Sequence, residues 1–329
     1  MLLDLDLERE RQRDRAIVDP AFRQDVLAGL ALPQKAVPAR WFYDRAGSEL
    51  FEAITALPEY YPTRVETGLL ERHAREIGRI AGPGRVVVEF GSGSSTKTPH
   101  LLGWTAPAAY VPIDISGEFL RDSAAMLAGQ FPGLNVIPVE HDFTQPLRLP
   151  DAVADRPKLG FFPGSTIGNF GPAAAVDLLR AMAATLGEGA LLLIGIDRVK
   201  DKRILIPAYN DAAGVTAAFN LNLLHRINRE LGGTIPVDAF THCARWVEGP
   251  SRIEMHLVAQ EPVAFEVAGQ RFAMAAGETI HTENSHKYGS RDAKLLLRAG
   301  GWEPLGGWAD EEGLFEMQIA KAVPRPTAP

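Results

Sequence analysis

The stretch EFGSGSSTKT at residues 89–98 restricts the possible folds strongly, because it directly follows the apolar run at residues 86–88. Gly91 and Gly93 allow the backbone to turn sharply and to approach a ligand closely. A glycine-containing loop between a buried strand and a helix is a common nucleotide-binding site in α/β proteins, where backbone amides face the ligand. The loop therefore predicts an α/β sheet with a nucleotide-like ligand at its edge.

Strand-like and helix-like patterns alternate along the chain from residue 85 to about residue 200. Short apolar runs bounded by Gly, Pro or Asp are separated by helical patterns such as those at 117–128 and 173–186. The runs lie at residues 86–88, 109–115, 135–139, 159–162 and 191–196. Strands joined by crossover helices predict a mainly parallel, doubly wound sheet that binds its ligand at the carboxyl ends of the strands.

The pattern changes after Asp197, which indicates a second, α+β module. A long helical stretch at 207–231 leads into short strands separated by the turn sequences EGPS and AGQ. These strands are expected at 245–247, 252–259, 264–267 and 271–273. A helix at 292–298 and strands near 302–308 and 313–322 then return to complete the first sheet, and the final PRPTAP is expected to be disordered.

Composition excludes several classes of function. The net charge is -7 and no basic cluster contains interleaved aromatics, so no nucleic-acid partner is expected. The apolar runs are shorter than the roughly 18 residues of a membrane span, and acids near the start argue against a secretory signal. A cytoplasmic protein is expected. One cysteine excludes an internal disulfide, and none of the 8 histidines forms an H-E-x-x-H pair, so no metal site is predicted.

The residues around the loop favour S-adenosylmethionine over a nicotinamide dinucleotide. Thr96 stands where a dinucleotide fingerprint has its third glycine, and Glu89 would repel a pyrophosphate but suits a cationic or zwitterionic ligand. Asp114 follows the loop by roughly 20 residues, the position of a ribose-binding acid. Asp142 and Phe143 follow the third run and offer an acceptor for the adenine amino group and an apolar face for the ring.

Five segments make the sequence recognisable. It resembles the L-histidine Nα-methyltransferases of ergothioneine biosynthesis, in the same order from about residue 20 to residue 322. The similarity is carried by WFYDRAGSELFEAITALPEYYPTRVE (41–66), EFGSGSSTKT (89–98), FFPGSTIGNF (161–170), PAYNDAAGVTAAFN (207–220) and TENSHKY (282–288). The resemblance implies a Rossmann-like class I methyltransferase sheet with a second, smaller α+β substrate-binding domain, working as a monomer.

The resemblance also implies which residues bind each ligand. S-adenosylmethionine is expected on Gly91, Lys97, Asp114, Asp142, Phe143 and Gly164. Histidine is expected on Tyr60, Asn169, Tyr209, Met255, Glu283 and Ser285, with Tyr60 as the candidate catalytic residue beside the amine. Asn169 and Tyr209 suit a carboxylate, and Glu283 and Ser285 suit the two ring nitrogens of an imidazole.

The expected division of the chain assigns residues 65–199 and 289–329 to the methyltransferase domain and residues 1–64 and 200–288 to the substrate-binding domain. Two alternatives remain within this fold. One is an α-amino methyltransferase for another amino acid such as tryptophan, against which Glu283 and Met255 argue. The other is a non-catalytic protein that binds S-adenosylmethionine, against which the presence of both residue sets argues. An NAD-dependent oxidoreductase is disfavoured by Glu89 and Thr96.

Overall fold

The computed structural model describes residues 19–323. The predicted disordered tail PRPTAP and the start of the predicted substrate-binding domain lie outside the described residues. Within the described part, no helix is both long and apolar enough to span a membrane.

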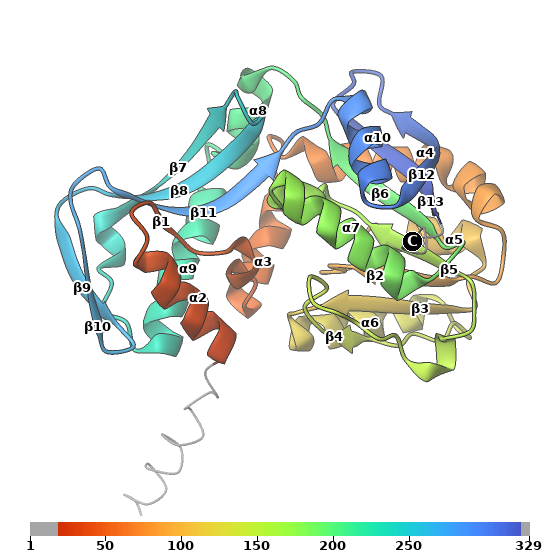
Figure 1. Ribbon diagram of the computed structural model, residues 1–329, viewed down its shortest axis with the longest axis horizontal. Coiled ribbons are helices and arrows are strands. Elements are labelled where there is room, and N and C mark those ends of the chain that lie inside the picture. The colour runs from red at the N-terminus through yellow and green to blue at the C-terminus, as the bar shows by residue number, and fades with distance from the viewer. Residues whose placement is uncertain (1–18, 324–329) are drawn as a thin grey trace, which may run out of the picture.

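A seven-stranded sheet forms one side of the molecule (Figure 1). Its order is β12-β13-β6-β5-β2-β3-β4, and every neighbouring pair is parallel except those that involve β13. The strands are β2 (Val86–Phe90), β3 (Ala109–Asp114), β4 (Val139–Glu140), β5 (Lys158–Phe162), β6 (Leu191–Asp197), β12 (Trp302–Ala309) and β13 (Phe315–Ala322). The predicted doubly wound sheet, completed by the C-terminal strands, is confirmed.

Helices cover both faces of this sheet, which explains why β2, β5 and β6 consist almost entirely of buried residues. On one face, α7 (Pro172–Leu186) and α10 (Ser290–Ala299) pack against the strands. On the other lie α4 (Tyr61–Ala81), α5 (Thr98–Thr105) and α6 (Gly117–Gln130). The carboxyl ends of the parallel strands are left uncovered by this packing and are available to form a site.

A second, four-stranded sheet has the order β1-β11-β8-β7 and a hydrophobic core of its own. Its strands are β1 (Lys35–Ala36), β7 (Phe240–Val247), β8 (Arg252–Ala259) and β11 (Thr279–His286), and the hairpin β9 (Val263–Val267) with β10 (Gln270–Met274) extends beyond it. It is packed by α2 (Pro20–Leu30), η1 (Ala39–Phe42), α3 (Arg45–Thr55), α8 (Lys202–Tyr209), α9 (Val215–Leu231) and η4 (Val237–Ala239). Because β1 pairs with β11, the N-terminal segment and the insertion after β6 share one sheet.

Three predictions need correction. The single helix expected at 207–231 is two helices, because Gly214 adopts φ 75° and Asp211 accepts hydrogen bonds from the first amides of α9. The strand expected at 135–139 shrinks to β4 and one isolated bridge, because Pro138 lacks a ladder donor. The segment TENSHKY, where no strand was expected, lies mostly on β11.

Candidate active site

A cavity of about 830 Å³ lies where the carboxyl ends of β2, β3 and β5 face β11 and the N-terminal segment. Nine of the predicted site residues line it: Tyr60, Gly91, Lys97, Asp114, Asp142, Phe143, Gly164, Asn169 and Glu283. Tyr209, Met255 and Ser285 do not line it and lie in the layer behind. All six predicted cofactor residues and three of the predicted acceptor residues therefore share one cavity.

The glycine loop is shaped by its close neighbours. Gly91 adopts φ 70°, and a Cβ atom there would lie 3.2 Å from the Phe143 ring. The amide of Gly93 donates to the Asp114 carboxylate at 2.9 Å, and the amide of Ser116 donates to its other oxygen at 2.9 Å. Since a carboxylate has about four acceptor positions, Asp114 keeps lone pairs for a ribose diol.

Lys97 has a partner that the sequence did not reveal. Glu66 on α4 is fully buried, forms an ion pair with Lys97 and accepts a hydrogen bond from the amide of Gly164 at 2.9 Å. One carboxylate therefore fixes two predicted cofactor residues. Glu66 occupies an inward position on an otherwise ordinary amphipathic helix, so no local sequence signal marks it.

Glu89 lies at the end of β2 and lines the cavity. Its carboxyl accepts hydrogen bonds from the Thr98 hydroxyl at 2.6 Å and the Tyr110 hydroxyl at 2.5 Å. Burial nevertheless raises the pKa of Glu89 to about 7. A positive charge in the cavity would favour its ionised form.

Asp142 is held by the N-terminal segment. Its carboxylate accepts from Arg40 at 2.6 Å, and its other oxygen accepts from the amide of Thr144 at 2.9 Å. The same guanidinium donates to Asp25 at 2.7 Å, so Arg40 ties α2 to the end of β4. Arg40 also lines the cavity, and it was missed because nothing in the local sequence relates it to Asp142.

Tyr60 is the N-cap residue of α4 and is 8% exposed. Its ring packs edge-on against Phe51 at 6.2 Å and against Tyr209 at 6.3 Å between centroids. Burial raises the pKa of Tyr60 well above its ordinary value. Its phenol is therefore neutral around pH 7, with an oxygen that can accept a hydrogen bond.

Glu283 reaches the cavity from an irregularity in β11. The register with β8 shifts between His281 and Glu283, and the His281 Nε2 atom is 2.9 Å from the Glu283 carbonyl oxygen. The His281 side chain thus bridges the bulge that sets the direction of Glu283. Burial raises the pKa of the Glu283 carboxyl to about 7, although the charge of Lys287 opposes this shift.

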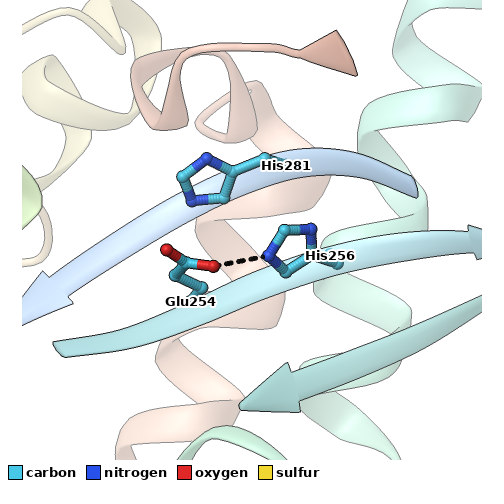
Figure 2. A group of neighbouring side chains, drawn as sticks. All are labelled: Glu254, His256 and His281. Atoms are coloured by element: carbon cyan, nitrogen blue, oxygen red, sulfur yellow. Dashed lines mark hydrogen bonds and ion pairs between the residues drawn. The ribbon is translucent and has the colours of Figure 1, made fainter. Parts of the chain in front are cut away.

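His281 also belongs to a cluster with Glu254 and His256, whose potential metal-ligating atoms lie within 4.8 Å of one another (Figure 2). The Glu254 carboxylate already accepts hydrogen bonds from Arg245 at 2.7 Å and from His256 at 3.0 Å, and its second oxygen accepts from Arg252 at 2.5 Å. Two guanidinium groups on the only carboxylate of the cluster oppose binding of a second cation. The absence of a metal site stays a prediction.

Behind the cavity, the hydroxyls of Tyr209 and Ser285 lie 2.7 Å apart, and Lys287 donates to each at 2.8 Å. Tyr209 ends α8, where the His242 ring nitrogen lies 2.8 Å from its carbonyl oxygen. Met255 is 2% exposed and is paired with Glu283 across β8 and β11. These three predicted acceptor residues support the cavity wall in this structure.

Comparisons with known proteins agree with this geometry. A family model described as histidine-specific methyltransferase, SAM-dependent, matches residues 22–322. The chain is 42% identical to the histidine N-alpha-methyltransferase of Mycolicibacterium smegmatis, over 91% of this chain and 94% of that protein. It is 30% identical to ergothioneine biosynthesis protein 1 of Neurospora crassa, over 85% of this chain and 33% of that protein. It is 25% identical to an L-tryptophan methyltransferase of Psilocybe serbica, over 92% of this chain and 93% of that protein.

Proposed function

Because the chain belongs to the histidine-specific, S-adenosylmethionine-dependent methyltransferase family, we propose that it trimethylates the α-amino group of L-histidine to hercynine, the first step of ergothioneine biosynthesis. The observation that carries the proposal is the one cavity lined by all the predicted cofactor residues and by three of the predicted acceptor residues. A non-catalytic cofactor-binding protein would have no need of the acceptor residues Tyr60, Asn169 and Glu283 there.

The cofactor half of the cavity fits S-adenosylmethionine. In this proposal Asp114 accepts from the ribose hydroxyls and Asp142 from the adenine amino group, while Phe143 packs against the ring. Lys97 faces the methionine carboxylate. Gly91 has no side chain, so the space between the loop and the Phe143 ring stays open for the ligand. Glu89 balances the positive charge of the ligand. Bound S-adenosylmethionine supplies an electrophilic methyl group on a sulfonium.

The acceptor half orients histidine by its two ends. Asn169 and Tyr209 bind the α-carboxylate, and Glu283 and Ser285 bind the imidazole, so the amine between these ends is directed towards the cofactor. Tyr209 and Ser285 lie behind the lining residues, so their contact with the substrate requires lining side chains to move. Met255 fills the wall beside Glu283.

Each transfer requires a free amine lone pair, which forms the new C–N bond as the methyl–sulfur bond breaks. The ammonium must therefore lose a proton before each round. Tyr60 is neutral, so its oxygen accepts a hydrogen bond from the ammonium. As the ammonium proton moves to this oxygen, the hydroxyl proton of Tyr60 leaves to water, and no stable phenolate forms. The rest of the acceleration comes from holding the two reactants in line.

The finer expectations about organisation also remain proposals. Residues 65–199 and 289–329 form the methyltransferase domain, and residues 1–64 and 200–288 form the substrate-binding domain. Separate hydrophobic clusters under the two sheets support this division. The protein is proposed to act as a monomer in the cytoplasm without a nucleic-acid partner, and its net charge of -7 is consistent with the last point.

The deciding experiment is mass spectrometry of L-histidine incubated with the purified protein and S-adenosylmethionine, with tryptophan and other amino acids in parallel. A gain of three methyl groups on histidine alone is expected. Methylation of tryptophan instead would retain the fold and cofactor but replace the acceptor. No transfer to any amino acid, with S-adenosylmethionine still bound, would favour a non-catalytic protein.

A further inference from the structure

Lys287 is a fully buried cation whose three donors are all used. Its side chain is 0% exposed, and its ammonium contacts Asp197 at 2.6 Å, the Tyr209 hydroxyl at 2.8 Å and the Ser285 hydroxyl at 2.8 Å. An ammonium has three N–H groups, so these contacts saturate it. Lys287 thus joins two residues that are proposed to bind opposite ends of histidine.

The charges around Lys287 do not cancel. Asp197 also pairs with Lys200 and accepts from the Tyr61 hydroxyl at 2.7 Å. Burial alone would raise the pKa of Asp197, but Lys287 and Lys200 together lower it below its ordinary value, so Asp197 is an anion. Two buried ammonium groups therefore share one carboxylate. The other acidic group that interacts with Lys287 is Glu283, and while its carboxyl is protonated the remaining positive charge favours an anionic ligand group near Tyr209 and Ser285.

The hydrogen bonds also restrict how the two hydroxyls can act. Each oxygen accepts a hydrogen bond from Lys287, and at 2.7 Å one hydroxyl donates a hydrogen bond to the other. Two hydroxyls carry two protons, so the pair has one proton left for a ligand. A carboxylate can only accept hydrogen bonds, so if it contacts Tyr209 it accepts the one that this remaining O–H group donates. Ser285 then donates its only O–H group to Tyr209, so toward a ligand it can act only as a hydrogen-bond acceptor.

We propose, on the basis of the proposed function, that Lys287 is a positioning residue for the amino-acid substrate. It orders the hydroxyl pair so that Tyr209 donates to the substrate carboxylate and Ser285 accepts from an imidazole N–H. Glu283 and Ser285 alternate near the end of β11, so they lie on one side of the strand, and Lys287 follows the last residue of β11 with its ammonium on the Ser285 hydroxyl. Lys287 does not contact the substrate itself.

Lys200 provides a matched control. Lys200 and Lys287 each pair with Asp197, but Lys200 contacts the Tyr61 hydroxyl at 2.7 Å and not Tyr209 or Ser285. Lys200→Met and Lys287→Met both remove one buried cation from the same carboxylate. Only the second removes the donors to the hydroxyl pair. A difference between these variants therefore isolates the positioning role from neutralisation of Asp197.

The test is calorimetric binding of histidine and of histamine, which lacks the carboxylate, to each protein saturated with S-adenosylhomocysteine. Lys287→Met should weaken histidine binding by roughly 10- to 100-fold, the usual effect of losing a hydrogen bond to a charged group. Histamine binding should change by less than about 3-fold, and Lys200→Met, which removes one charge but no donor to the hydroxyl pair, should weaken histidine binding much less than Lys287→Met does. Equal losses in the two variants, equal losses for the two ligands, or no loss would each overturn the proposal.

Two further variants test the proposal even if the Lys287→Met protein fails to fold or to bind S-adenosylhomocysteine. Lys287→Gln keeps amide donors without the charge and should show a smaller loss of the same selectivity for histidine over histamine. Tyr209→Phe should lose that selectivity as well, and its retention would overturn the assignment. A wild-type protein that binds neither ligand would instead refute the proposed function, so the two failures are distinguishable.

Discussion

Met255 and Glu283 are directly paired across the antiparallel strands β8 and β11. Paired residues on neighbouring strands project to the same face, so the buried Met255 side chain lies beside a cavity-lining carboxyl with a pKa of about 7. Met255 lies behind the cavity lining and gives an indole no direct contact, and an indole would leave part of Glu283 unsatisfied. An imidazole can satisfy Glu283, and the pair therefore favours a small polar heterocycle.

Glu283→Ala should weaken discrimination in favour of histidine by roughly 1 to 3 kcal/mol, the cost of a lost buried hydrogen bond. The measurement is kcat/KM for histidine and for tryptophan. Glu261→Ala, at an exposed position in the turn after β8, is the control and should leave both values unchanged. Unchanged histidine kinetics in Glu283→Ala would remove this residue from the imidazole site.

Tyr60→Phe should lower kcat by roughly 10-fold, the effect of one lost hydrogen bond, without changing the shape of the pH profile. Burial raises the pKa of Tyr60 well above its ordinary value, so the phenol does not titrate between pH 6 and 9. The rate should instead rise with pH as the substrate ammonium ionises, in wild type and variant alike.

Tyr288→Phe is the matched control, because the buried Tyr288 hydroxyl has no hydrogen-bond partner among the described residues and lies outside the cavity lining. It should behave as the wild type. A pH profile that flattens only in Tyr60→Phe would identify Tyr60 as the titrating base. A flat wild-type profile would argue against control by substrate deprotonation.

Glu66→Ala should lower the free energy of unfolding by about 3 kcal/mol, because it leaves Lys97 unpaired and the Gly164 amide without an acceptor. The double variant Glu66→Gln with Lys97→Met should recover much of that loss, since both charges are gone and the glutamine oxygen can accept from Gly164. The affinity of the double variant for S-adenosylhomocysteine should nevertheless remain below that of the wild type, because Lys97 is missing. Urea unfolding and calorimetry separate the two effects, and recovery of affinity with stability would contradict a role for Lys97 in binding.

Local sequence information was sufficient for most of the main sheet and for the positions of Gly91, Asp114, Asp142 and Phe143, whereas Lys97 and Gly164 were expected from the resemblance. Gly91, Asp114 and Asp142 each lie at or after the end of an apolar run, and the carboxyl ends of parallel strands necessarily meet at one edge. The positions of Tyr60, Asn169 and Glu283 in the cavity were expected from the resemblance to a family and not from any local pattern. Glu283 in particular lies in a polar segment whose strand character depends on pairing with β8.

The supporting residues could not be predicted in the same way. Glu66 and Lys97 lie 31 residues apart, and Arg40 and Asp142 lie 102 apart. Their pairing depends on how helices and loops pack after folding, and neither charge pattern stands out locally. The break between α8 and α9 was missed for a different reason, because a helical pattern does not reveal a capping aspartate within it.

Glu89 should make the protein less stable as pH rises from about 4.5 to about 7. Its pKa is near 4.5 when exposed and about 7 in the fold, so in this range the folded state holds a proton that the unfolded state has released. The stabilising contribution is complete below pH 4.5 and is lost by pH 7, and it amounts to at most about 3 kcal/mol. Glu89→Gln keeps an acceptor for Thr98 and Tyr110 but cannot ionise. The difference in unfolding free energy between pH 5 and pH 8 should therefore be smaller in the variant than in the wild type. Equal differences would mean that Glu89 is ionised in the folded protein throughout this range.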